Sequence, residues 1–409
     1  MAVTVLLVGA FDTKGPEYAF LRERILADGI DVLTLNTGVL GSTELFPVDI
    51  EAAQVATEGG SELSAIREKK DRGEAMRVMA DGVAKLLPGL HASGKMDGVI
   101  GMGGSGGSSV VTAGMRALPI GVPKVCISTV ASGQTSAFVG AKDVVLFPSI
   151  TDVAGVNRIS QVIFARAAGA ICGMVRAKLP EVVDERPIIV ASMFGNTTEC
   201  VDDCRIALDR EGYEVLVFHA TGTGGQTMEA LVDEGLVDAV LDITTTEWAD
   251  EVCGGTLSAG SDRLSAPGRQ GLPHLIVPGC VDMANFGPLE TVPEKYKTGR
   301  NLYEWNPAIT LMRTTVEENA KMGEIFAEKA NAATGPVAFL LPLRGVSILD
   351  GEGERFCDRQ ADAALFDALK KNLNPSIDVE EIDANINDKA FSARAVQRLL
   401  ELIAERRTG

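Results

Sequence analysis

The sequence predicts an α/β protein made of two Rossmann-like domains, each built on a mainly parallel sheet. Three observations support this. Short, continuous apolar runs alternate with amphipathic segments at helical spacing, which is typical of parallel strands buried on both faces. The chain has 409 residues, too many for one ordinary core. The two halves also repeat a pattern of residues, which indicates an internal structural duplication.

The first half begins with the apolar run VTVLLVGAF, which we expect to form a strand. A polar turn, DTK, follows, and Pro16 suits the first turn of the next helix. Tyr18, Leu21 and Ile25 share one face of that helix, and Gly29 can end it. The run GIDVL then predicts a second strand.

The second half repeats this order from Pro187, starting with the run PIIVASMF. Val201, Cys204 and Leu208 have the same 3-then-4 spacing, and Gly212 follows them as Gly29 follows the first set. The run GYEVL corresponds to GIDVL. Further along, DGVIGMGGSGG corresponds to VDAVLDITTTEWAD, VPKVCISTVASG to LPHLIVPGCVDMAN, and DVVLFPSITD to AITLMRTTVEEN.

The domains are expected at 1–183 and 184–409, meeting near VVDERP at 182–187. The second domain adds the strand GPVAFLLPL, a helix around ADAALFDALKK, the strand DVEEID and a final helix. Residues 41–75 are expected to arch over the first domain or to contact a partner.

Composition narrows the function classes. The formal net charge is −18, from 56 acidic and 38 basic residues, which disfavours nonspecific binding to nucleic acid or to an anionic membrane. No apolar run approaches the length that spans a bilayer. The apolar start lacks a basic n-region, so we interpret it as a strand and not as a signal peptide. Seven cysteines without close CxxC spacing favour reduced thiols in the cytoplasm.

A glycine-rich stretch after the run DGVI carries the strongest chemical signal of the first half. Ligands of such sheets bind beyond the carboxyl ends of the strands, and glycine N–H groups with serine hydroxyls can converge there on an anion. These donors belong to Gly103, Gly104, Ser105, Gly106, Gly107, Ser108 and Ser109. The stretch matches neither a Walker A motif nor the GxGxxG spacing. The alternative is a tight strand-to-helix turn packed against its neighbour.

Two other strand ends strengthen this hypothesis. In Asp12-Thr13-Lys14, the lysine can supply a point charge, and Asp12 can hold Mg²⁺ or a ribose hydroxyl. The alternative is a helix N-cap beside an exposed lysine. Thr129 and Ser132 follow the run VPKVCIS. Three such strand ends together favour a phosphate or carboxylate site.

The second half carries polar residues at its own strand ends, and we expect them to form an acid/base and anion-clamping site. The candidates are His219, Glu247, Asp282, Asn285 and Arg313. Each alone is a weak signal, because a histidine after a strand is more often structural. No sequence pattern identifies a metal site: Cys200 and Cys204 share a helix face, but no histidine lies near them.

Eight motifs together resemble a known family: FDTKGPEYAFLR, GMGGSGGSS, VCISTVASG, MFGNTT, VFHATGTGG, LDITTTE, DMANFG and LMRTT. They are similar to uncharacterised bacterial and fungal proteins related to the N-terminal module of the tomato mosaic virus resistance protein. The resemblance covers essentially the whole chain. It implies a two-domain Rossmann-like fold, binding of ATP with Mg²⁺, and a homodimer. Trp305 stands where relatives carry a histidine before Asn-Pro, so any role of that imidazole is absent here.

These observations lead to one main hypothesis and two alternatives. The main hypothesis is a cytoplasmic ATP-binding protein with the nucleotide on Asp12, Thr13, Lys14, Thr129 and the 103–109 loop. A small metabolite is then acted on, or sensed, in the interdomain region. The first alternative is an ATP-independent enzyme of small organic or sugar acids, with Glu247 or His219 as base. The second is a nonenzymatic ligand sensor. No residue pattern identifies a reaction.

Overall fold

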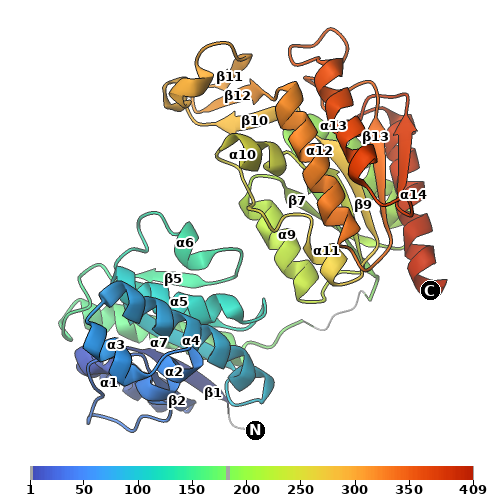
Figure 1. The fold of residues 1–409 in the computed structure, drawn as a ribbon. Helices are drawn as coiled ribbons and strands as arrows, with labels where there is room; N and C mark the ends of the chain where they lie inside the picture. Colours follow the sequence, from blue (N-terminus) through green and yellow to red (C-terminus); the bar gives the residue numbers. More distant parts are fainter. Residues whose placement is uncertain (1–2, 181–184, 409) are drawn as a thin grey trace. The chain divides into compact units, whose positions relative to one another are not determined.

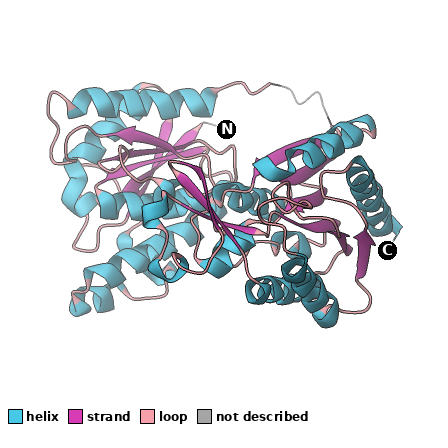
Figure 2. Ribbon diagram, turned by 90° about the horizontal axis from the view of Figure 1, so that it is seen from above, coloured by secondary structure: helices cyan, strands magenta, loops and turns pink. Residues whose placement is uncertain are grey.

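The computed structural model describes residues 3–180 and 185–408. The chain divides into two compact units, Met1–Glu181 and Val182–Gly409. In each unit, helices flank a parallel sheet (Figure 1; Figure 2). The α/β class and the two Rossmann-like sheets predicted from the sequence are therefore confirmed. The boundary predicted between residues 183 and 184 lies outside the described residues.

Unit 1 contains a five-stranded sheet in the order β2-β1-β3-β4-β5, with all neighbours parallel. The strands are β1 (Thr4–Gly9), β2 (Asp31–Asn36), β3 (Gly98–Gly103), β4 (Lys124–Ser128) and β5 (Val145–Pro148). The helices are α1 (Phe11–Ala27), α2 (Ala52–Glu58), α3 (Leu63–Lys69), α4 (Arg72–Ala92), α5 (Ser105–Ala117), α6 (Ser136–Val139) and α7 (Ser160–Arg176).

The two faces of this sheet have separate cores, because side chains alternate along β1. Leu6 and Val8 face α2, α4 and α5, while Val5 and Leu7 face α1 and α7. Helix α1 uses the face predicted for it, since Tyr18 is fully buried in the second of these cores. The segment 41–75 supplies α2 and α3, which contribute buried side chains to the first core. It therefore covers a face of unit 1.

Unit 2 contains a six-stranded parallel sheet in the order β14-β13-β9-β8-β6-β7. Its strands are β6 (Ile188–Met193), β7 (Glu214–His219), β8 (Ala239–Thr244), β9 (His274–Gly279), β13 (Val337–Pro342) and β14 (Asp378–Ile382). A separate antiparallel sheet joins β10 (Met283–Phe286), β12 (Ile309–Arg313) and β11 (Leu302–Asn306) in that order.

The helices of unit 2 cover both faces of the larger sheet. Helices α8 and α14 pack on one face, and α10, α12 and α13 contribute to the core that includes the side chains of the opposite face. The helices are α8 (Thr198–Arg210), α9 (Thr223–Asp233), α10 (Glu247–Cys253), α11 (Ala266–Arg269), α12 (Val316–Asn331), α13 (Arg359–Asn372) and α14 (Lys389–Thr408). Short 3₁₀ turns occur at Gly195–Thr197, Leu289–Thr291 and Glu294–Tyr296.

The duplication is visible in the strand order. Read from β7, the larger sheet of unit 2 runs β7-β6-β8-β9-β13, which matches β2-β1-β3-β4-β5, and β14 is an addition. One predicted correspondence is wrong. The run AITLMRTT forms β12 of the antiparallel sheet, and the place of β5 is taken by GPVAFLLPL, which forms β13. An apolar run indicates a strand, but not its direction or its partner.

Candidate functional site

The best candidate site lies at the carboxyl edge of the unit 1 sheet. In the order β2-β1-β3-β4-β5 the chain leaves β1 toward one side for β2 and toward the other side for β3. Such a switch of direction opens a crevice at the strand ends where open α/β sheets bind ligands. Asp12-Thr13-Lys14 follows β1 and the glycine-rich stretch follows β3, so these two predicted segments flank the switch point.

The glycine-rich stretch is shorter as a loop than predicted, because α5 begins at Ser105 with Gly104 as its N-cap residue. No side chain caps this helix, so its first-turn N–H groups, on Ser105, Gly106 and Gly107, have no acceptor within the helix. The positive end of the helix dipole adds to their attraction for an anion. Helix α5 therefore offers a place for a phosphate or carboxylate.

Part of the stretch is structural, as the alternative interpretation expected. A Cβ atom at Gly103 would lie 2.7 Å from the Cα of Gly107, so glycine lets α5 approach β3 closely. Ser108 is buried, and its Oγ lies 2.6 Å from the Oγ of Ser128. Ser108 therefore ties β4 to α5, whereas Ser105 and Ser109 are exposed.

The segment after β1 also differs from the predicted polar turn. It forms the first turn of α1, with a kink at Lys14, where φ is −127° and ψ is 24°. Thr13 is exposed, and Lys14 is half-buried without an ion-pair partner in the part of the chain described. Asp12 accepts a hydrogen bond from the Leu40 N–H at 2.9 Å through Oδ2, while its buried Oδ1 has no protein partner.

The hydroxyl of Tyr18 fills the gap where β1 and β3 separate. It accepts a hydrogen bond from the Met102 N–H at 2.8 Å and lies 2.9 Å from the carbonyl oxygen of Val8. Burial raises the pKa of this phenol well above its ordinary value, so it stays neutral. Tyr18 therefore bridges the ends of β1 and β3.

Thr129 connects the glycine-rich stretch to a pocket at the ends of β4 and β5. Its N–H donates to the Gly103 carbonyl at 3.2 Å, and a Cβ atom at Gly104 would lie 3.7 Å from its Oγ1. The pocket has a volume of about 390 Å³, and Thr129 and Ser132 line it. The sequence placed these two residues at the site but did not single out the other wall, Ser149–Asp152, although the motif DVVLFPSITD contains it.

The five residues predicted to form one site in unit 2 lie in separate places in the structure. His219 is exposed at the end of the edge strand β7, where its ring makes an edge contact with Phe194 at 5.4 Å. Glu247 is buried, and its Oε1 accepts hydrogen bonds from the N–H groups of Gly222 and Gly225 at 2.8 and 3.0 Å. The predicted loop HATGTGG is thus wrapped around an internal carboxylate.

Glu247 belongs to a buried ion-pair network centred on Arg263, which is 1% exposed. Arg263 Nε donates to Glu247 at 2.7 Å, and its two Nη atoms bond both oxygens of Asp242. Burial alone would raise the pKa of Asp242, but Arg263 and then His274 hold it well below its ordinary value. This network was not predicted from the sequence, where its one visible signal is an aspartate inside the apolar run AVLDIT.

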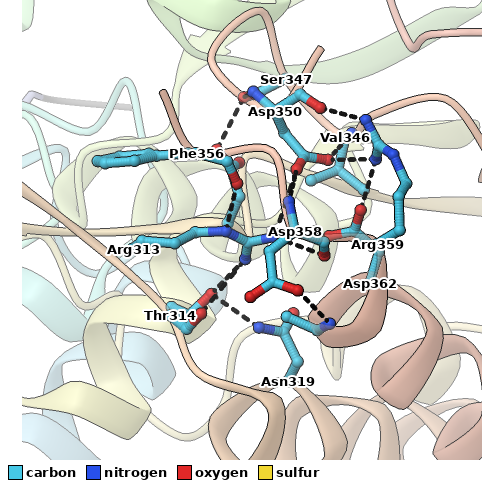
Figure 3. Close-up of polar contacts among 12 residues, drawn as sticks. Arg313, Thr314, Asn319, Val346, Ser347, Asp350, Phe356, Asp358, Arg359 and Asp362 are labelled. Atoms are coloured by element: carbon cyan, nitrogen blue, oxygen red, sulfur yellow. Dashed lines mark hydrogen bonds and ion pairs between the residues drawn. The ribbon is translucent and has the colours of Figure 1, made fainter. Parts of the chain in front are cut away.

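Arg313 and Asp282 do share a neighbourhood, in a second buried cluster. Figure 3 shows the contacts of Arg313 in this cluster. Arg313 Nη2 donates to Asp362 at 2.8 Å and to Asp350 at 3.3 Å, and Arg359 bonds the same two carboxylates. Burial and the Asp350 carboxylate raise the pKa values of Asp282 and Asp362. The cluster pins β12 to α13, which sequence spacing could not indicate because its members lie far apart in the chain.

Asn285, the last predicted member, belongs to neither network. Its side-chain amide donates to Asp250 Oδ2 at 2.8 Å, and its N–H donates to Asp250 Oδ1 at 3.0 Å. Burial raises the pKa of Asp250 to about 7 despite these donors. Four of the five predicted residues, Glu247, Asp282, Asn285 and Arg313, are thus buried side chains, and the fifth lies apart from them. These four side chains contact other buried groups, although Asp282 Oδ1 and Asn285 Oδ1 have no partner among residues 3–180 and 185–408.

Within residues 3–180 and 185–408, no group of three or more His, Cys, Asp or Glu side chains is arranged to hold a metal ion. No helix among these residues has both the length and the apolar content needed to cross a bilayer.

Comparison with known proteins places this architecture in a family. The N-terminal domain model of "Uncharacterised protein family (UPF0261)" matches residues 3–180, and the C-terminal domain model matches residues 186–403. The chain belongs to the UPF0261 family. The resemblance drawn from the eight sequence motifs is confirmed by a plant relative: the ToMV resistance protein Tm-1(GCR237) of Solanum lycopersicum is 38% identical over 421 residues. That match covers 97% of this chain and 55% of the plant protein.

Bacterial members of the UPF0261 family match over nearly their whole length. A UPF0261 protein of Clostridium tetani is 45% identical over 98% of both chains, and one of Rhizobium meliloti is 46% identical over 96% of this chain and 97% of its own. Among solved structures, the glycosyltransferase SsfS6 of Streptomyces sp. SF2575, complexed with thymidine diphosphate, is 14% identical. It covers 99% of this chain and 96% of its own, with a TM-score of 0.20, too low to carry an argument.

Proposed function

We propose that unit 1 binds ATP together with Mg²⁺ and holds the nucleotide phosphates at the start of α5. One observation carries the proposal: the first turn of α5 has uncapped N–H groups at the carboxyl edge of the sheet, beside the switch point. In unit 2 two of the glycine N–H groups at the start of α9, those of Gly222 and Gly225, already donate to Glu247. The N–H groups at the start of α5 are therefore more available to an external anion than those at the start of α9.

Local charge supports an anion at this place although the whole chain is acidic. Backbone N–H groups and a helix terminus act at short range, where they outweigh the screened field of a net charge of −18. Lys14, which has no ion-pair partner among residues 3–180 and 185–408, can add a full positive charge. Thr129 and the exposed Ser105 can add hydroxyl donors.

The residues present fit a magnesium ion carried in with the nucleotide. Mg²⁺ commonly takes one or two carboxylates from the protein and its other ligands from phosphate oxygens and water. A dedicated cluster of three acidic ligands is therefore unnecessary. Asp12, whose buried Oδ1 has no protein partner, is our candidate for that carboxylate. The ion would neutralise phosphate charge at this edge.

We choose ATP among phosphorylated ligands because of the sequence resemblance. On the same ground we propose that the protein is a homodimer, and we place it in the cytoplasm. The seven free cysteines, six of them buried, suit a reducing compartment. The proposal includes a small metabolite that the protein acts on or senses. The ATP-independent alternative used Glu247 or His219 as base. The buried contacts of Glu247 do not favour it.

Calorimetric titration of the full chain with ATP, with and without Mg²⁺, tests the proposal. Gly104→Val is the decisive variant, because a Cβ atom there meets only Thr129 Oγ1 at 3.7 Å and the fold should tolerate it. A valine would occupy the space above the first turn of α5, so we expect affinity to fall at least about tenfold. Lys14→Ala should weaken ATP binding as well.

Gly89→Ala serves as the matched glycine control. Gly89 lies within α4, and nothing approaches a Cβ atom there within 4 Å. This variant should bind ATP like the unmodified protein. Absence of ATP binding by the unmodified chain, or equal affinity in Gly104→Val, would refute the proposed site.

A further inference from the structure

The pocket beside α5 is lined by side chains, whereas the start of α5 presents backbone N–H groups. It lies at the ends of β4 and β5 and is lined by hydroxyl side chains, one carboxylate and two apolar residues. Its volume of about 390 Å³ is in the range of small-molecule sites. The lining includes Thr129, Ser132, Pro148, Ile150, Thr151 and Asp152.

Several polar groups of this pocket have no partner. Thr129, Ser132 and Asp152 are exposed, and their side chains make no hydrogen bond or ion pair among residues 3–180 and 185–408, so they are free to bind a ligand. Thr151 is the stronger signal, because its Oγ1 is buried and also lacks a protein partner. Buried polar atoms without partners are rare in folded proteins and point to a missing ligand or water.

The backbone at the pocket rim is also unusual. Ile150 has φ of 63°, in the left-handed region that a β-branched residue seldom adopts, and its side chain is 71% exposed. Residues held in such conformations tend to occur at ligand sites. The conformation places an apolar side chain at the rim, and Pro148 adds a second apolar surface.

This combination of groups suits a polyhydroxylated ligand and not a second phosphate. A carboxylate repels a phosphate, but it accepts hydrogen bonds from a pair of neighbouring hydroxyls. Ser and Thr hydroxyls can both donate to and accept from a sugar. Pro148 and Ile150 can contact the C–H face of a sugar ring.

We propose that this pocket binds the sugar portion of a phosphorylated ligand whose phosphate lies at the start of α5. The inference rests on the proposed function for the position of the phosphate. Thr129 links the two parts, because it lines the pocket and its Oγ1 lies beside Gly104. The sugar is either the ribose of a nucleotide or the body of a separate sugar phosphate; the hydroxyl chemistry is shared.

The test compares ligands with and without hydroxyls on the full chain in the presence of Mg²⁺. ATP, 2′,3′-dideoxy-ATP, tripolyphosphate and ribose 5-phosphate are titrated into the unmodified protein, Asp152→Ala and Thr151→Val. Asp31→Ala is the control, since Asp31 is an exposed carboxylate at the opposite end of the strands. It makes the same change of charge away from the pocket.

We expect ATP to bind at least about tenfold more tightly than dideoxy-ATP, because dideoxy-ATP lacks the hydroxyls that would donate hydrogen bonds to a charged group. Asp152→Ala should abolish that difference without changing the affinity for tripolyphosphate, and Asp31→Ala should keep it. Thr151→Val should reduce the difference. Equal binding of ATP and dideoxy-ATP, or an affinity ratio that survives in Asp152→Ala, would overturn the assignment to the ribose of a nucleotide. Binding of ribose 5-phosphate that depends on Asp152 would then assign the pocket to a separate sugar phosphate.

The remaining outcomes separate this inference from the proposed function. If tripolyphosphate and ATP bind and Gly104→Val abolishes both, the phosphate site stands whatever the pocket does. If ATP fails to bind but ribose 5-phosphate binds and Asp152→Ala removes it, the pocket takes a separate sugar phosphate. Failure of every hydroxyl-bearing probe to depend on Asp152 refutes the inference.

Discussion

Arg263 offers the sharpest test of how unit 2 is stabilised. It is 1% exposed and is shared by three buried carboxylates, those of Glu229, Asp242 and Glu247. Arg263→Met keeps an unbranched apolar stem but removes the guanidinium with all its donors. The three carboxylates would then be left in the interior, with the His274 ring as the remaining side-chain partner of Asp242.

The size of the effect follows from that geometry. Removing one partner of a buried ion pair costs about 3–5 kcal/mol, because a charge is left uncompensated in the interior. With three carboxylates affected, we expect the upper part of this range. At about 2 kcal/mol per molar urea, the unfolding midpoint should fall by about 2 M. Part of the loss arises at the 222–225 turn, which Glu247 would hold less firmly.

Tryptophan fluorescence can follow unit 2 by itself. The chain has two tryptophans, Trp248 and Trp305, and both lie in unit 2. Trp248 is 4% exposed beside the network, so its emission should shift to longer wavelength when unit 2 unfolds. Urea titrations monitored this way report the free energy of unfolding of unit 2 without a contribution from unit 1.

Arg344→Met is the matched control, because Arg344 makes an equally close bidentate pair with Asp383, at 2.6 and 2.7 Å, on the surface. Both side chains of this pair are solvent-exposed, so the midpoint should hardly change. Arg263→Lys, which keeps the charge but not the planar fork, should fall between the two. An Arg263→Met midpoint equal to that of Arg344→Met would refute the reasoning.

Three further predictions concern single groups. Asp250 has a folded pKa of about 7, above its unfolded value, so it makes unit 2 less stable as the pH rises from about 4 toward 8; Asp250→Asn should flatten that slope in urea titrations at several pH values. Tyr18→Phe should lower the free energy of unfolding of unit 1 by about 1–3 kcal/mol, measured by calorimetry, because a buried N–H of β3 loses its acceptor. A result near zero would show that water replaces the hydroxyl. Gly103→Ala should cost about 1–3 kcal/mol because α5 must move away from β3, whereas Gly104→Ala should be nearly neutral in the same scans.

Much of the architecture was predictable because it depends on local periodicity. Apolar runs of strand length and helix faces such as Tyr18, Leu21 and Ile25 appear in the structure where the spacing put them. The duplication was also visible, since equivalent elements bury equivalent faces. The exception was AITLMRTT, which pairs antiparallel with Met283–Phe286. Its apolar content is that of a parallel strand, and only contacts distant in sequence set its direction.

The candidate site was only partly predictable. Glycines and polar residues after strands mark positions where the chain approaches a ligand or another element, and sequence alone does not separate the two cases. Gly103 and Ser108 serve packing, whereas the start of α5 has no internal cap. Arg263 lies in a loop without periodicity, so its network could not be predicted from spacing.

The sequence by itself determined the fold class, the repeat of the two units, the family and the strand ends at which chemistry is possible. The two-residue period of strands, the 3.6-residue period of helices and the order of the motifs are properties of the sequence itself. The tertiary structure decided which polar residues are available. Burial turned Glu247, Asp282 and Arg313 into partners of other side chains, while the order of the strands brought Thr129 beside Gly104 and a pocket with unpaired hydroxyls. Availability depends on what packs around a group, and packing joins residues far apart in the chain.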